Sequence, residues 1–351
     1  MMKKSNLISI VLLFVVTFFI FSCKKDSPIK TSPPVMPIEN CPNSYDSKSI
    51  PYDSLYKGTI ATQCTFSPST IYLDKFIYSH ACVNPNNPYE IAYIKRENNT
   101  QPFNNFDLYK FDFCSGMETM LAKMVGYSSD WSVKNWIIYT GMDKQLWKVK
   151  SNGDSLTQLT NTGNYNNNAR WNLSGTKYLY LDASIGNINN MVIANADGTQ
   201  KQHINQTMSI WDWSNDSSIV FSNQFSNTNP IEIKELNISN SITIIKKTIN
   251  LFGNFSSYHN RTNSIILNEY VNQNLSKMKV YYLDTDNSML LSNNTPSYST
   301  SYVNILNDNK ILYQRILKDT LTGNPCKLNY RSHIAIMNLD GTNERQVIFP
   351  D

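Results

Sequence analysis

Short apolar runs alternate with polar turns along most of this chain, and the same order of runs and turns recurs. In the clearest copy, Trp171 opens a polar turn, the apolar run Tyr178–Leu181 follows, and a second run, Met191–Ala194, ends in the turn Asn195–Gly198. β-Branched and aromatic residues fit the pleated, half-buried surface of a strand. Asp-Gly and Asn-Gly pairs supply the positive φ angle that tight hairpins need. The pattern therefore predicts antiparallel strands joined by short turns.

The copies recur every 40–45 residues and begin at aromatic residues, namely Trp131, Trp171, Trp213 and Tyr258. A degenerate copy precedes them over residues 90–111 and another follows from residue 310, which makes six. Several strands in a repeat of this length are typical of a propeller blade, and stacking blades around an axis buries the faces that one blade leaves exposed. We predict an all-β fold, a six-bladed β-propeller of four-stranded antiparallel blades over residues 59–351. The alternative, an ordinary β-sandwich, does not require this recurrence.

The repeat aromatics are expected to pack as core wedges between neighbouring blades. The apolar run Trp136–Tyr139 suits a strand buried on both faces, and the alternating run Ile231–Lys234 suits a strand with one face in water. Aromatic residues at the ends of loops have a different use, because they stack on sugars or anchor peptides. The sequence leaves open which loops carry such residues.

The repeat also resembles a known family. Its order is Trp-Ser-x-Asp/Gly, Ile-x-Tyr/Phe, Leu-Trp-x-Val, Asp-Gly and Gln-Leu-Thr, which resembles the TolB-like propeller repeat and is similar to the propellers of prolyl-oligopeptidase-type peptidases. The resemblance covers roughly residues 85–350 and is clearest from Tyr127 to Phe221. It implies a propeller fold and a protein partner in envelope organisation. The peptidases carry a catalytic domain after the propeller, and we expect none after the last repeat here.

The N-terminus carries an export signal. Lys3 and Lys4 precede the apolar run Leu7–Phe21, an arrangement typical of a secretory signal peptide. Residues 20–23, Ile-Phe-Ser-Cys, resemble a bacterial lipobox, which implies a signal peptide over residues 1–22 and lipidation of Cys23. Since lysine rather than aspartate follows the cysteine, the resemblance favours an outer-membrane lipoprotein of a Gram-negative bacterium, facing either side. The alternatives are an uncleaved anchor and ordinary secretion.

A proline-rich segment over residues 23–58 is predicted to tether the propeller, because proline stiffens a chain into extended conformers. Part of it, near Ile50–Leu55, is alternatively expected to pack on the propeller. Export permits disulfides, and the odd number of remaining cysteines leaves one thiol unpaired. The first candidate pair is Cys82 with Cys114, and the second is Cys41 with Cys64.

Charge and motifs exclude several functions. The net charge of +4 is too small and too evenly spread to suggest nucleic-acid binding. The four histidines, His80, His203, His259 and His333, form no zinc motif, and no nucleophile elbow or phosphate loop occurs. We therefore predict no cofactor, no metal and no catalytic residue.

The predicted function is that of a lipid-anchored, non-catalytic scaffold in the cell envelope that binds a protein or a glycan. The alternative is a hydrolase or lyase acting on polysaccharide through residues around the central channel. A cluster of His, Asp and Arg converging there would favour the enzyme. A plugged or uncharged channel with an apolar patch on the rim would favour partner binding.

Overall fold

The structure is a computed structural model, and it describes residues 41, 44–52, 69–72, 74–98, 106–183, 190–204, 210–222, 230–250, 253–260, 262–272, 275–285, 287–291, 298–307, 309–320 and 327–350. They belong to one compact unit, Glu39–Asp351. The predicted signal peptide, Cys23 and most of the predicted tether lie outside the described residues. Within these ranges, no helix is long and apolar enough to cross a bilayer.

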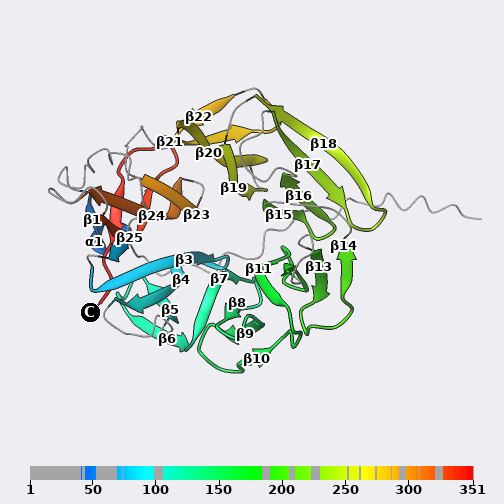
Figure 1. Ribbon diagram of the computed structural model, residues 1–351, viewed down its shortest axis with the longest axis horizontal. Helices are drawn as coiled ribbons and strands as arrows, with labels where there is room; N and C mark the ends of the chain where they lie inside the picture. Colours follow the sequence, from blue (N-terminus) through cyan, green and yellow to red (C-terminus); the bar gives the residue numbers. More distant parts are fainter. Residues whose placement is uncertain are drawn as a thin grey trace, which may run out of the picture. The chain divides into compact units, whose positions relative to one another are not determined.

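The described strands form six sheets arranged as blades around an axis (Figure 1). Blade 1 comprises β3 (Phe76–Asn84), β4 (Asn87–Glu97), β5 (Phe106–Asp112) and β6 (Glu118–Ala122). Blade 2 comprises β7 (Val125–Trp131), β8 (Trp136–Gly141), β9 (Leu146–Lys150) and β10 (Thr157–Gln158). Blade 3 comprises β11 (Tyr165–Trp171), β12 (Lys177–Ala183), β13 (Asn190–Asn195) and β14 (Gln202–Ile204).

The remaining blades follow the same antiparallel order, with the first strand nearest the axis (Figure 1). Blade 4 comprises β15 (Ile210–Asn215), β16 (Ser218–Ser222), β17 (Ile231–Asn237) and β18 (Ile242–Ile249). Blade 5 comprises β19 (Gly253–His259), β20 (Ser264–Asn272), β21 (Leu275–Tyr282) and β22 (Ser288–Leu290). Blade 6 contains β23 (Tyr298–Asn307), β24 (Lys310–Thr320), β25 (Lys327–Asn338) and β26 (Arg345–Val347). The six-bladed propeller predicted from the repeat is confirmed.

A separate apolar core fills each junction between neighbouring blades. Trp131 packs between blades 1 and 2, Trp171 between blades 2 and 3, and Trp213 between blades 3 and 4, and all three are buried. Tyr258 is half-buried and packs at the junction of blades 4 and 5. Burying a large apolar side chain stabilises a fold by roughly 1.5–3 kcal/mol, so the repeat aromatics hold the ring together as core wedges.

Two N-terminal strands complete blade 6. The helix α1 (Ser44–Ser47) leads into β1 (Ser49–Pro51), which pairs antiparallel with the outer edge of β26. The strand β2 (Ser69–Tyr72) pairs parallel with β25. The prediction of a tether is therefore wrong for residues 44–52, which belong to the propeller. The alternative, that the segment near Ile50 packs on the propeller, is correct for the described residues. These residues carry no repeat pattern, because their strand forms only against the edge that β26 provides.

The disulfide joins Cys41 to Cys114, with their Cα atoms 5.6 Å apart. Both predicted pairings, Cys82 with Cys114 and Cys41 with Cys64, are therefore wrong. Cys82 is a buried free thiol in the core between blades 1 and 2, whereas Cys114 lies in the exposed turn between β5 and β6. Spacing along the sequence did not reveal that the N-terminal segment returns to this turn. Cys64 lies outside the described residues.

Candidate binding site

The end of β4 and the start of β5 lie on one face of the propeller, and so do the end of β16 and the start of β17. Residues 98–105 join β4 to β5, and residues 223–230 join β16 to β17. On the opposite face the corresponding hairpins are short, with residues 85–86 between β3 and β4 and residues 216–217 between β15 and β16. We call the first face the long-loop face. Since rigid scaffolds carry their binding residues mostly on loops, a binding site is expected there.

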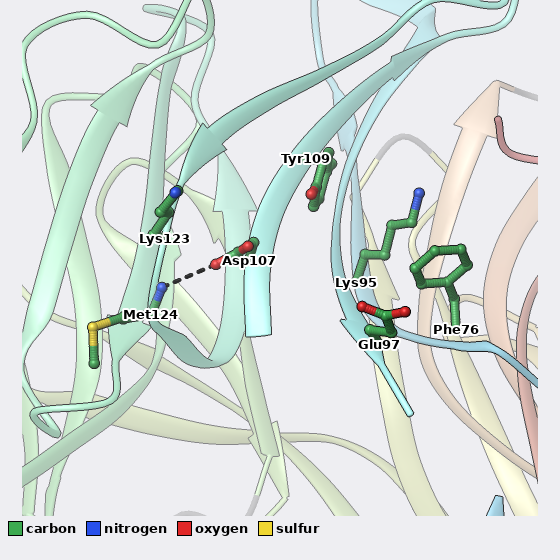
Figure 2. Close-up of a pocket in the computed structure, with 7 residues that line it drawn as sticks. All are labelled: Phe76, Lys95, Glu97, Asp107, Tyr109, Lys123 and Met124. Atoms are coloured by element: carbon green, nitrogen blue, oxygen red, sulfur yellow. Dashed lines mark hydrogen bonds between the residues drawn. The ribbon is translucent and has the colours of Figure 1, made fainter. Parts of the chain in front are cut away.

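A pocket of about 320 Å³ opens on blade 1 at the long-loop face (Figure 2). The start of β3, the end of β4 and the start of β5 meet at this face because the strands run antiparallel. They and the connection from β6 to β7 supply the lining residues, which are Phe76, Lys95, Glu97, Asp107, Tyr109, Lys123 and Met124. A volume of this size lies at the lower end of the range for small-molecule sites.

The ammonium group of Lys95 lies between two aromatic rings of the pocket. Its Nζ is 4.3 Å from the centroid of the Phe76 ring and 5.3 Å from that of Tyr109. The same Nζ lies 2.9 Å from Oε2 of Glu118 and donates to the carbonyl oxygen of Pro350 at 3.1 Å. Lys95 is only 6% exposed, so these contacts offset the cost of burying its charge. The cation–π contacts also hold the rings of Phe76 and Tyr109 on the same ammonium group.

Charged side chains complete the wall and rim of the pocket. A carboxylate oxygen of Asp107 accepts a hydrogen bond of 3.2 Å from the backbone N–H of Met124, which ties β5 to the connection before β7 (Figure 2). Glu97 and Lys123 also line the pocket, and both are exposed. Burial raises the pKa of Tyr109, and the neighbouring carboxylates of Asp107 and Glu118 raise it further. The Tyr109 hydroxyl therefore stays protonated at neutral pH and can donate a hydrogen bond.

A ring of equivalent residues lies around the propeller axis. Each residue precedes the position of the repeat aromatic on the innermost strand of its blade, and together they are Cys82, Asp130, Arg170, Asp212, Ser257 and Asn304. We call this set the axial ring. The repeat thus brings three charged side chains to neighbouring blades, although sequence inspection selected none of them.

Most polar side chains of the axial ring fasten one blade to the next. Asp130 accepts a hydrogen bond of 2.6 Å from the backbone N–H of Trp171, and Asn304 donates one of 2.7 Å to the carbonyl oxygen of Ala81. Arg170 lies 3.8 Å from Asp130. Asp212 likewise accepts from the backbone N–H of Tyr258. These contacts explain the charges of the ring as structural links between blades.

Burial governs the ionisation of the axial ring and its neighbours. It raises the pKa of Asp212 to about 7, an effect that Arg170 opposes and Asp130 reinforces. Burial and the charge of Arg170 lower the pKa of His80 to about 3, so this histidine is neutral. Burial raises the pKa of the Cys82 thiol to about 12, which leaves it unreactive at neutral pH.

The remaining histidines do not converge on either site. His333 is buried in blade 6 with its Nε2 3.0 Å from Asp74, His259 lies at the end of β19, and His203 lies on the outer strand β14. In the described part of the chain, no three His, Cys, Asp or Glu side chains are grouped to hold a metal ion. Sequence reasoning missed Phe76 and Tyr109, because they lie outside the repeated positions.

The ring of six blades, with its repeat aromatics between them, defines a six-bladed β-propeller. No protein-family model matches the sequence, and no curated protein matches it. Among solved structures, a putative TolB from Agrobacterium tumefaciens is 12% identical, with 67% of this chain and 86% of that chain covered and a TM-score of 0.53.

Two propellers of named enzymes are similar to the same degree. An oligogalacturonate lyase from Vibrio parahaemolyticus is 10% identical, with 74% of this chain and 77% of that chain covered and a TM-score of 0.51. The acylaminoacyl peptidase of Pyrococcus horikoshii is 10% identical, with 78% of this chain but 46% of that chain covered and a TM-score of 0.51. These similarities establish a shared fold.

Proposed function

We propose that this propeller is a non-catalytic binding module of the cell envelope, anchored through lipidated Cys23, which binds a saccharide in the pocket of blade 1. The observation that carries the proposal is the composition of that pocket. Two aromatic rings, Phe76 and Tyr109, flank a buried ammonium group, and exposed charged groups surround them. The resemblance of the repeat to TolB-like propellers supports the envelope as its location.

A sugar ring fits this chemistry because it presents two kinds of surface. Its C–H groups form an apolar face that packs on an aromatic ring, and its hydroxyl groups donate hydrogen bonds to carboxylates and accept them from ammonium groups. Phe76 and Tyr109 offer the first contact, and Glu97 and Lys123 offer the second. The rings and the charges lie in one pocket, and such a mixture of apolar walls with a few polar groups is typical of small-molecule sites.

Binding is tested with the full chain on an array of bacterial glycans, followed by titration calorimetry with the best saccharide. We expect Tyr109→Ala to weaken binding at least tenfold, because one stacking face is lost. Tyr127→Ala is the matched control, since Tyr127 is 52% exposed on β7 outside the pocket. Absence of binding to any glycan, or equal weakening by both substitutions, would refute the saccharide site.

The anchor has its own test. Palmitate labelling of the full chain in a Gram-negative host is expected to be lost in Cys23→Ser and kept in Cys82→Ser, since Cys82 is buried in the propeller. Labelling that persists in Cys23→Ser would contradict lipidation at this cysteine and leave the saccharide proposal intact.

The second candidate is an enzyme that cleaves polysaccharide at the axial ring. Asp130, Arg170 and Asp212 are close neighbours there, and a carboxyl group with a pKa of about 7 can both donate and accept a proton at neutral pH. The test is incubation with oligogalacturonate, the saccharide named for one similar propeller, with detection of unsaturated products. We expect no turnover; turnover abolished by Asp212→Asn would favour the enzyme.

A further inference from the structure

A carboxylate outside the lining of the blade 1 pocket holds the ammonium group inside it. Glu118 begins β6 and does not line the pocket, yet its Oε2 and Oε1 accept hydrogen bonds of 2.9 and 3.2 Å from Nζ of Lys95. Oε1 also accepts a hydrogen bond from the Tyr93 hydroxyl. The side chains of Lys95 and Glu118 are 7% and 12% exposed. Charge-assisted hydrogen bonds are strong where little water surrounds them, so the two groups act as one pair.

The protein itself satisfies the N–H donors of Lys95. An ammonium group has three such donors, and Nζ of Lys95 makes three hydrogen bonds, two to Glu118 and one of 3.1 Å to the carbonyl oxygen of Pro350. Its other contacts are with the rings of Phe76 and Tyr109 (Figure 2). A ligand in the pocket therefore meets Lys95 as a cation whose charge is already neutralised and whose donors are occupied.

The charges left for a ligand are mainly negative. Besides Lys95, the lining carries one ammonium group, on Lys123, and two carboxylates, on Glu97 and Asp107. Because Glu118 offsets the charge of Lys95, the charged groups of the site sum to one negative charge. Like charges brought together at a binding site repel each other, so a carboxylate on a sugar is disfavoured. An uncharged sugar meets no such repulsion and keeps the aromatic stacking.

We propose that Glu118 determines which saccharides the pocket accepts, because its bond to Lys95 makes the site select uncharged saccharides and exclude uronic acids. The inference rests on the proposed saccharide site in blade 1. Glu118 is then a specificity-determining residue that acts through Lys95 and touches no ligand itself. A purely structural role for this ion pair leads to a different expectation, since a loosened pocket would bind uncharged and acidic saccharides more weakly to the same degree.

The unaltered full chain is measured first. Titration calorimetry compares pairs of oligosaccharides that differ only in having a hydroxymethyl group or a carboxylate at C6. We expect the acidic member of a pair to bind more weakly by about tenfold or more. Equal affinities for both members would overturn this inference and leave the saccharide site intact. Absence of binding to any saccharide would overturn the proposed function as well.

Glu118→Gln tests the residue itself. Glutamine keeps the size of the side chain and still accepts a hydrogen bond from Lys95, but it leaves the ammonium charge unbalanced. We expect the affinity for the acidic member, relative to the uncharged member, to rise by about tenfold or more, because close charge pairs at binding sites are coupled at least that strongly. Glu90→Gln is the matched control, since Glu90 lies 3.5 Å from Lys110 in the same blade, outside the pocket. It removes the same charge and should leave this ratio unchanged.

A double variant separates the charge from the shape of the pocket. Adding Lys95→Met to Glu118→Gln removes the unbalanced cation, and the ratio is expected to return to that of the unaltered chain. Urea unfolding checks that each variant folds, because Glu118→Gln leaves a buried charge without its partner, which lowers stability. If this variant does not fold, the paired oligosaccharides on the unaltered chain remain the test. A ratio that does not rise in Glu118→Gln, rises equally in Glu90→Gln or stays raised in the double variant would overturn the inference.

Discussion

The junction between blades 6 and 1 differs from the junction between blades 2 and 3. Between blades 2 and 3, Trp171 fills the core, and the chain runs directly from β10 into β11. Between blades 6 and 1, the core receives residues from both ends of the described chain, Tyr45 and Phe349. The first junction is built from one repeat and the next, whereas the second depends on segments outside the repeat.

The added segments bind blade 1 to blade 6 in several ways. The ring centroid of Phe349 lies 4.2 Å from the ring centroid of Tyr93 and 5.1 Å from that of Phe111, and both of these residues belong to blade 1. Tyr45 stacks on Tyr89 at 4.9 Å, and its hydroxyl donates to the carbonyl oxygen of Pro88 at 2.7 Å. The disulfide fastens the same N-terminal segment to blade 1. Closing a ring of blades therefore uses aromatic packing and a covalent link where the repeat ends.

The largest effect is expected from removing the aromatic ring of Phe349. Phe349→Ala leaves a cavity between blades 6 and 1, and such substitutions cost about 3–5 kcal/mol of the free energy of unfolding. Ile348→Ala is the control, because Ile348 is 42% exposed, and it should change stability by no more than about 0.5 kcal/mol. Urea unfolding measures both. Similar losses in the two variants would mean that the junction does not depend on the Phe349 ring.

This junction also shows what the sequence could and could not predict. Trp131, Trp171 and Trp213 recur with fixed spacing, so the blades and their cores follow from local pattern. The position of Phe349 depends on its contact with blade 1, where it packs on Tyr93. These two residues are far apart in the sequence, and such a contact leaves no periodic signal. The pairing of Cys41 with Cys114 was missed for the same reason.

The residues of the pocket and of the axial ring could not be predicted from the sequence for two other reasons. Phe76 and Tyr109 lie in the first and least regular copy, where alignment to the repeat gives no guide. Asp130, Arg170 and Asp212 occupy one repeated position but differ in residue type, because several side chains can bond to the next blade's backbone. A repeated position is therefore visible in the sequence only when the same kind of side chain fills it.

A smaller loss is expected from opening the disulfide. Cys114→Ser frees the N-terminal segment from blade 1, and since the closed loop spans 73 residues, about 2–4 kcal/mol of the free energy of unfolding should be lost. Reductant should lower the urea midpoint of the unaltered chain to the same value. It should leave the midpoint of Cys114→Ser unchanged; a further drop there would show that another disulfide closes the ring.

A pH-dependent effect is expected at the links between blades that Asp212 and Asn304 form. Burial raises the pKa of Asp212 from 3.8 to about 7, so between these pH values the folded chain holds a proton that the unfolded chain has released. Stability should therefore fall as the pH rises from about 4 to about 7. Asp212→Asn should flatten this slope in urea titrations at several pH values.

Asp154→Asn is the matched control for that slope, because Asp154 is an exposed residue of the turn between β9 and β10. It should leave the dependence of stability on pH unchanged. If Asp212→Asn and the unaltered chain show the same slope, the carboxyl of Asp212 is ionised in the folded propeller. The link to Tyr258 would then be a charged hydrogen bond, and it would hold blades 4 and 5 together more strongly than Asn304 holds blades 6 and 1.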